Sequence, residues 1–186
     1  MEWFLQLSAD GLNDGAMYRT FWRRVWAAFF DFLILMPPAA ALFWYWPRLT
    51  SPTLQIALFV LASMYGVAYS ILLHAKWGQT FGKMATGVRV IDVAGGPIGL
   101  RQALRRDSPA LVLSIASTAL GIRDILAGEY ALMPASEGPL SIALGAAGFI
   151  WSLAEILTMV TNPRRRAIHD LIARTVVVKT RLPTDV

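Results

Sequence analysis

Residues Leu54–Leu73 read LQIALFVLASMYGVAYSILL, twenty consecutive positions without a charged side chain. An α-helix rises about 1.5 Å per residue, so a stretch of this length matches a hydrocarbon core of about 30 Å. Ser51 and Pro52 stand shortly before the stretch, where a serine N-cap and a proline in the first turn favour the start of a helix. The segment therefore predicts a helix that crosses a membrane.

Three further apolar blocks accompany this segment. Val25–Trp46 contains one charged residue, Asp31, and Pro139–Thr161 also contains one, Glu155. Ser108–Ile122 is uncharged but has only 15 residues, about 22 Å of helix, which is short for a bilayer. The pattern predicts an all-α membrane protein of about four transmembrane helices, the third of them short or irregular.

The composition supports the same class of protein. Hydrophobic residues make up 56% of the chain and charged residues only 16%, against about 25% charged residues in soluble domains. Residues 1–20 hold several charges and no sustained apolar core, so we expect a cytoplasmic N-terminal segment rather than a cleaved signal peptide. The absence of cysteine excludes disulfides, thiolate metal ligands and a cysteine nucleophile.

The basic residues indicate the orientation of the chain. Of the 17 Lys and Arg residues, only Arg48 and Arg123 lie outside three regions: before the first block, between the second and third, and after the fourth. Lys and Arg accumulate on the cytoplasmic side of membranes, so we expect both termini and the loop 74–107 in the cytoplasm. This topology also explains the net charge of +5, and we expect no nucleic-acid binding because no matching motif accompanies the charge.

The loop and the tail contain strand-like segments. Gly87–Asp92 alternates apolar and polar residues, and Thr175–Val178 is rich in β-branched residues. A lone strand leaves its backbone polar groups unpaired, so we expect Val88–Ile91 to pair with Thr175–Val178. A short amphipathic helix is expected at Arg164–Ala173. The chain thus divides into segment 1–20, a bundle 21–161 that includes loop 74–107, and a tail 162–186 that packs on the loop to form a small two-stranded cytoplasmic cap.

Three motifs occur in order along the chain. Phe21–Asp31 places an arginine at the start of the first helix and an aspartate seven positions later. Gly78–Val90 is similar to a G-x-T-x-G-K loop that runs into a strand, and His169–Val178 is similar to an H-D-x-x-A-G-T-x-V-V tail in which Arg174 replaces the usual glycine. Together they resemble the RDD family of bacterial membrane proteins, named for one arginine and two aspartates. On this resemblance the name-giving residues are Arg24, Asp31 and Asp170.

The resemblance covers most of the chain and is weakest over Ala110–Leu157. It implies a multi-pass protein of the bacterial cytoplasmic (inner) membrane. Some members of the family are implicated in the exchange of sodium or other monovalent cations for protons. The resemblance therefore implies that the intramembrane carboxylates of this chain bind ions.

Two carboxylates are the candidate ion- and proton-binding groups. A charged carboxylate inside a bilayer costs at least about 2.5 kcal/mol, so Asp31 and Glu155 need a functional or structural reason to be there. Arg24 lies seven positions before Asp31, on the same helix face and about 10 Å away along the axis. The readings of Asp31 and Arg24 as an ion site with an electrostatic gate, or as a structural clamp between helices, both stay open. Whether Asp31 and Glu155 share a site stays open as well.

The remaining candidates lie outside the apolar blocks. Because the loop and the tail are expected to pair, Asp170 is predicted to form a salt bridge with a loop arginine, and His169 lies beside it. The candidate partners are Arg89, Arg105 and Arg106. Four other basic residues are predicted to meet anionic lipid headgroups: Lys83, Arg164, Arg165 and Arg166. His74 and His169 are too few for a zinc site, so we expect no metal and no cofactor.

The sequence leaves two functions open. The first is a secondary transporter that exchanges Na⁺, Li⁺ or K⁺ for protons, as a homo-oligomer because four helices enclose little space. The second is a membrane scaffold or accessory subunit that transports nothing and whose cap docks a partner protein. An enzyme is not expected, because the chain shows no nucleophile–base pair, cofactor loop or complete metal set.

Overall fold

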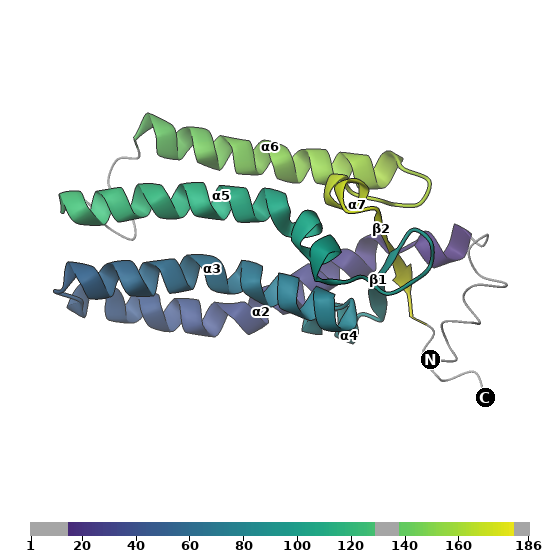
Figure 1. The fold of residues 1–186 in the computed structure, drawn as a ribbon, viewed down its shortest axis with the longest axis horizontal. Coiled ribbons are helices and arrows are strands. Elements are labelled where there is room, and N and C mark those ends of the chain that lie inside the picture. Colours follow the sequence, from purple (N-terminus) through teal and green to yellow (C-terminus); the bar gives the residue numbers. More distant parts are fainter. Residues whose placement is uncertain (1–14, 129–137, 181–186) are drawn as a thin grey trace.

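The computed structural model describes residues 15–128 and 138–180. Four long helices run side by side along the longest axis of the molecule, and the cap lies at one end of them (Figure 1). Short 3₁₀-helices flank the first long helix: η1 (Gly15–Tyr18) and η2 (Trp46–Arg48). The long helices are α2 (Phe21–Tyr45), α3 (Pro52–Trp77), α5 (Leu100–Ala127) and α6 (Pro139–Thr161).

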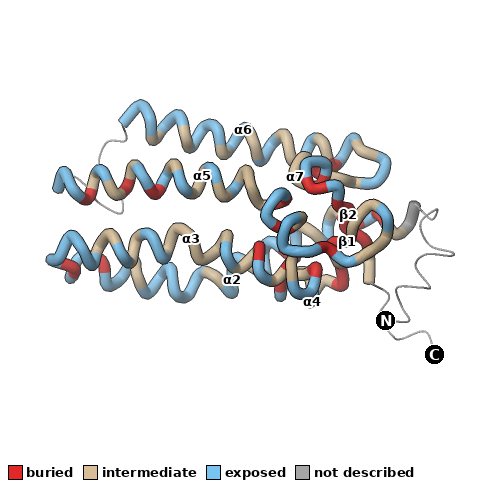
Figure 2. The backbone as a smooth tube through the Cα atoms, in the orientation of Figure 1, coloured by how far each residue is buried: buried red, intermediate tan, exposed pale blue. Residues whose placement is uncertain are grey.

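Each long helix is long and apolar enough to cross a membrane. Their large apolar side chains lie mostly on the outside, as Leu61, Val112 and Phe149 illustrate. Figure 2 shows this as long exposed stretches on α6 and α2. Such a surface is stable where lipid rather than water surrounds it. The architecture confirms the predicted all-α membrane protein of four spans.

The closest packing between long helices joins α3 to α5. Gly121 of α5 sits against the ring of Phe59, where even one added carbon would clash with the ring. The hydroxyl of Ser114 donates to the carbonyl of Ser63 across the same interface, 2.7 Å away. Small residues that let helices approach closely are the usual means of helix association in lipid. These two helices therefore form the centre of the bundle.

The third span differs from its prediction. The expected 15-residue segment Ser108–Ile122 lies inside α5, which has 28 residues and extends in both directions. Its first two turns contain the loop charges, since Arg105 and Arg106 are helical residues. The expected irregularity is present as a bend of α5 close to the cap (Figure 1), and the helix contains an internal proline, Pro109. The span looked short because its first turns are polar and belong to the cap.

The cap combines the loop and the tail as expected. It contains α4 (Phe81–Ala85), β1 (Val88–Asp92), α7 (Ile168–Ile172) and β2 (Thr175–Lys179). The two strands pair antiparallel, with Val88 opposite Lys179 and Asp92 opposite Thr175. Their apolar side chains are buried on both sides of the sheet, and Figure 2 shows the strands as the largest buried region. The expected amphipathic helix is shorter than the predicted Arg164–Ala173.

Candidate functional site

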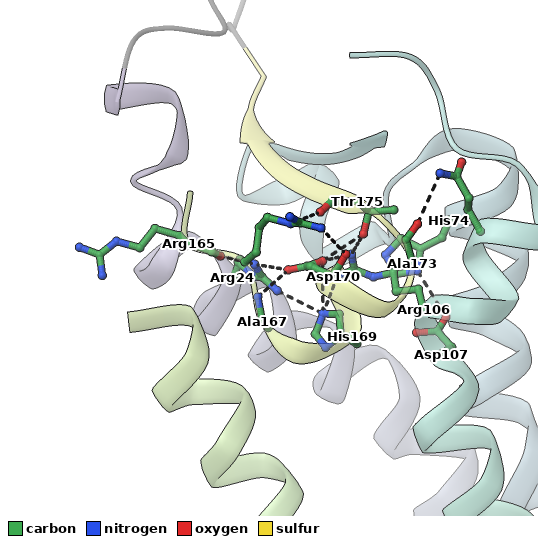
Figure 3. Close-up of polar contacts among 12 residues, drawn as sticks. Arg24, His74, Arg106, Asp107, Arg165, Ala167, His169, Asp170, Ala173 and Thr175 are labelled. Carbon is green, nitrogen blue, oxygen red and sulfur yellow. Dashed lines mark hydrogen bonds and ion pairs between the residues drawn. The ribbon is translucent and has the colours of Figure 1, made fainter. Parts of the chain in front are cut away.

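Asp170 is the centre of a buried ionic cluster that we call the clamp: Arg24, Arg106, His169 and Asp170. Its carboxylate is completely buried. Oδ2 lies 2.8 Å from Nη1 of Arg24, and Oδ1 accepts a hydrogen bond from Nη1 of Arg106. The same carboxylate accepts hydrogen bonds from the backbone N–H of Ala167 and the hydroxyl of Thr175 (Figure 3). The clamp therefore ties α2, α5, α7 and β2 together.

The two arginines decide the charge state of Asp170. Burial alone would raise the pKa of this carboxyl, but the positive charges of Arg106 and Arg24 outweigh it and hold the pKa well below its usual range. Asp170 is therefore ionised at all physiological pH values. A buried carboxylate with this many donors is a fixed counter-ion for two helices rather than an exchangeable acid.

His169 joins the clamp to Glu155 of α6. Its Nε2 lies 2.8 Å from Nη2 of Arg106 and 3.2 Å from Nη2 of Arg24, so it accepts hydrogen bonds and leaves the ring proton on Nδ1. Burial and the charge of Arg106 lower the pKa of His169, although Glu155 and Asp170 oppose them. The ring is therefore neutral near pH 7.

Glu155 is held less completely than Asp170. Its Oε1 accepts a hydrogen bond of 3.0 Å from the backbone N–H of His169. Its Oε2 lies 2.5 Å from Nδ1 of His169, the ring nitrogen that carries the proton, but the two groups are not aligned as in a regular hydrogen bond. The hydroxyls of Ser152 and Thr158 on the same helix donate to backbone carbonyls of that helix and not to Glu155. Oε2 is therefore a buried carboxylate oxygen whose polar neighbour is the protonated Nδ1 of His169.

Asp31 is held by the loop that precedes and forms α4. Its Oδ1 accepts hydrogen bonds from the hydroxyl of Tyr69 at 2.7 Å and the backbone N–H of Gly82 at 2.8 Å. Its Oδ2 accepts one from the hydroxyl of Thr80 at 2.6 Å. A carboxylate with three aimed donors is well satisfied without a second charge. Asp31 thus anchors α4 to α2 and α3.

The structure does not bring the two intramembrane carboxylates into one hydrogen-bonded site. Asp31 and Glu155 have separate partners, on α3 and α4 in one case and on α7 in the other. Arg24, seven positions before Asp31, pairs with Asp170. The gate expected between Arg24 and Asp31 is therefore not the observed contact.

Among the three arginines expected to pair with Asp170, Arg106 makes the salt bridge. Arg105, one position earlier in α5, is exposed. Arg89 lies in β1, opposite Val178 of β2. Arg166 was expected at lipid headgroups, but its guanidinium donates to the carbonyls of Thr175 and Asp170. It reinforces the clamp from the tail side.

The other expected headgroup residues differ in position. Lys83 is half-buried, and burial together with the charge of Arg106 lowers its pKa to about 8, against the attraction of Asp31. Its contact with lipid headgroups stays a prediction. Arg164 is exposed, and Arg165 is half-buried with its side chain pointing away from Asp170 (Figure 3).

Several partners were not recognised from sequence. Tyr69 and Thr80 bind Asp31, and Ser70 of α3 donates to Asp107 of α5 at 2.9 Å. Thr80 belongs to the G-x-T-x-G-K motif, so that motif was the available signal for the Asp31 site. Within the described residues, no group of three or more His, Cys, Asp or Glu side chains is arranged to hold a metal ion.

Comparisons with known proteins place this geometry in a family. The family model described as the RDD family matches residues 18–174, a range that contains Arg24, Asp31 and Asp170. No curated protein matches the chain, and no solved structure matches it. The family match spans the bundle and most of the cap. The chain belongs to the RDD family and is an integral membrane protein.

Proposed function

We propose that this protein is a secondary transporter that exchanges a monovalent cation, Na⁺, Li⁺ or K⁺, for protons, with Glu155 as the exchanging carboxylate. The observation that carries the proposal is Oε2 of Glu155, a buried intramembrane carboxylate oxygen that lies 2.5 Å from Nδ1 of His169 and has no well-aligned hydrogen-bond donor among the described residues. Intramembrane carboxylates of this kind mark ion and proton pathways. The proposal moves the main ion site from Asp31, whose oxygens already accept three hydrogen bonds, to Glu155.

The exchange chemistry follows from competition for one oxygen. When Oε2 carries a proton, Glu155 is neutral and the site has no charge to attract a cation. When the proton leaves, the carboxylate offers a negatively charged oxygen, the kind of hard ligand that a hard cation prefers. Burial and the charge of Arg106 lower the pKa of His169 and keep its ring neutral, so the ring does not act as a competing positive charge within the site. Only one of the two ions is bound at a time, which is the requirement for exchange.

The same proposal includes the setting of the protein. We place the cap end on the cytoplasmic side of a bacterial inner membrane because the basic residues of the chain gather there. A homo-oligomer is part of the proposal, because the spanning part of α6 is unburied in the single chain. A second copy against this helix would enclose a pathway beside Glu155.

The test is proton flux in proteoliposomes of the purified protein, with a pH dye inside and Na⁺, Li⁺ or K⁺ added outside. Wild-type protein should give a cation-dependent pH change, and Glu155→Gln should abolish it. Asp124→Asn is the matched control. It also removes one carboxylate charge, but from the last turn of α5, far from the cap and from Glu155, and it should retain flux. Flux that survives in folded Glu155→Gln would remove the role given to Glu155.

The second candidate is a scaffold or accessory subunit, and the clamp favours it. Asp31 and Asp170 are both saturated with hydrogen bonds and fix the cap rigidly to the bundle. Leu171 and Ile172 of α7 leave exposed apolar surface on this rigid cap, where a partner protein could dock. A silent flux trace from folded, inserted wild-type protein would favour this function over exchange.

A further inference from the structure

A separate feature of the cap end is a basic cavity of about 530 Å³. It lies between the start of α2, the end of α6 and the strand β2, on the side away from the Asp170 carboxylate. Four basic side chains line it, and none of the described residues that line it is acidic. These are Arg19, Arg23, Arg165 and Lys179. A concave site with this excess of positive charge fits an anionic ligand.

The rest of the lining is apolar and aromatic. Phe21 and Trp22 form one wall with their rings edge to face at 5.3 Å, and Val160 contributes from α6. Trp22 is 70% exposed, on the outside of the helix. Tryptophan at the end of a span sits at the headgroup level of a bilayer. A free polar anion would gain no favourable contact with this apolar wall, whereas the acyl chains of a lipid would pack against it.

The height of the cavity fits the same ligand. The first apolar span begins at Phe21 and the last one ends at Thr161, so the cavity opens where two spans leave the hydrocarbon region. This is the depth at which phospholipid phosphates lie, just outside a core of about 30 Å. Basic pockets between spans at this level are suited to anionic headgroups.

Two of the basic side chains are held in place before any ligand arrives. Arg23 donates from Nη1 to the carbonyl of Thr86 at 2.9 Å, which uses one of its five N–H groups. Arg165 has a positive φ of 50°, a backbone conformation that costs a residue with a side chain of order 1 kcal/mol. Nη1 of Arg24 binds the carbonyl of Arg165 at 3.0 Å and so stabilises that conformation. The clamp thereby orients Arg165 outward, toward the cavity.

We propose that this cavity binds the phosphate headgroup of an anionic phospholipid, such as phosphatidylglycerol, from the surrounding leaflet. The guanidinium groups of Arg23 and Arg165 bind the phosphate oxygens, and Arg19 and Lys179 add long-range attraction. The acyl chains lie along the exposed face of α2 next to Trp22. A free phosphate ion shares the headgroup chemistry but gains nothing from the apolar wall.

The experiment is native mass spectrometry of the full-length protein in detergent, titrated with phosphatidylglycerol or phosphatidylcholine. Wild-type protein should retain one phosphatidylglycerol in preference to phosphatidylcholine. The double variant Arg19→Gln, Lys179→Gln should bind phosphatidylglycerol about tenfold or more weakly, because each basic residue contributes separately. The charge-preserving variant Arg19→Lys, Lys179→Arg should keep the affinity, which separates loss of charge from loss of folding.

The matched control is Arg101→Gln, Arg105→Gln, which removes two exposed charges from the same end of the molecule outside the cavity. It should bind phosphatidylglycerol as wild type does. Equal losses in the control and cavity variants, or no preference over phosphatidylcholine, would overturn the proposal. Displacement of the lipid by an equal concentration of inorganic phosphate would overturn it in favour of a free-anion site.

Discussion

Asp170 shows how one buried carboxylate organises two membrane helices. Arg24 on α2 and Arg106 on α5 would each be costly to bury alone, and a shared counter-ion makes both acceptable. The backbone N–H of Ala167 and the hydroxyl of Thr175 satisfy the remaining lone pairs. The importance of Asp170 therefore lies in the two buried positive charges that share it as a counter-ion.

Replacing this carboxylate tests that view. Asp170→Asn should lower the free energy of unfolding by about 3–5 kcal/mol, because two buried guanidinium groups lose their counter-ion. Chemical or thermal unfolding of the purified protein in detergent measures the change. Asp124→Asn, at an exposed pair with its neighbour Arg123, is the control and should change stability by no more than about 1 kcal/mol. Similar stability of both variants would contradict the counter-ion role.

Lys83 gives the protein a pH dependence in the alkaline range. Its pKa is lowered to about 8 in the fold, mainly by burial, from 10.5. Between these two values the unfolded chain binds more protons than the folded chain, so stability should rise as the pH increases. Unfolding measured at pH 7.5 and pH 10 should show this rise in wild type and a smaller one in Lys83→Gln. Lys76→Gln, on an exposed position, should keep the full rise; a rise unchanged in Lys83→Gln would exclude Lys83 as its source.

At the scale of elements, α4 is fixed to α2 through one glycine. Gly82 donates its N–H to Asp31 and leaves no space for a side chain, because a Cβ there would overlap the carbonyl oxygen of Ala27 and lie 2.8 Å from Cγ of Asp31. The helix α4 can therefore approach α2 only while this position is glycine. The G-x-T-x-G-K motif supplies both the glycine and the threonine that hold Asp31.

Gly82→Ala should separate α4 from α2 and destabilise the protein by about 1–3 kcal/mol, the usual cost of overpacking. The measurement is again unfolding in detergent. Gly145→Ala on α6 is the matched control, because a Cβ at Gly145 meets nothing within 4 Å of it, and it should be neutral or slightly stabilising. Wild-type stability of Gly82→Ala would show that the loop tolerates a shift at this contact.

The sequence predicted elements better than it predicted contacts. The four spans and the pairing of β1 with β2 are legible because hydropathy and β-branching are local patterns. The start of α5 was not legible, since charged residues such as Arg101 and Asp107 hid the helix that continues into the cap. Without that helical phase, nothing distinguished Arg106, which is buried, from Arg105, which is exposed one position earlier.

At the scale of the whole molecule, contacts between distant parts of the chain explain why the partners in the site were not predicted from sequence. The partners of Asp31 lie 38 and 49 positions away on other elements, and no local pattern encodes such distances. Arg174 stands where the family usually has glycine and still adopts the left-handed conformation, with φ of 54°. The turn before β2 is therefore kept by the surrounding fold rather than by the residue. Long-range packing, not local preference, determines the site geometry.

The antiparallel pairing of β1 with β2 also sets an order of events during synthesis. Arg106 leaves the ribosome 64 positions before Asp170, and Arg24 leaves earlier still. The first three spans are thus synthesised before the counter-ion of both arginines. The cap closes only after translation has passed residue 179, so a chain that stops short of Asp170 contains two arginines without the counter-ion that they share in the complete fold.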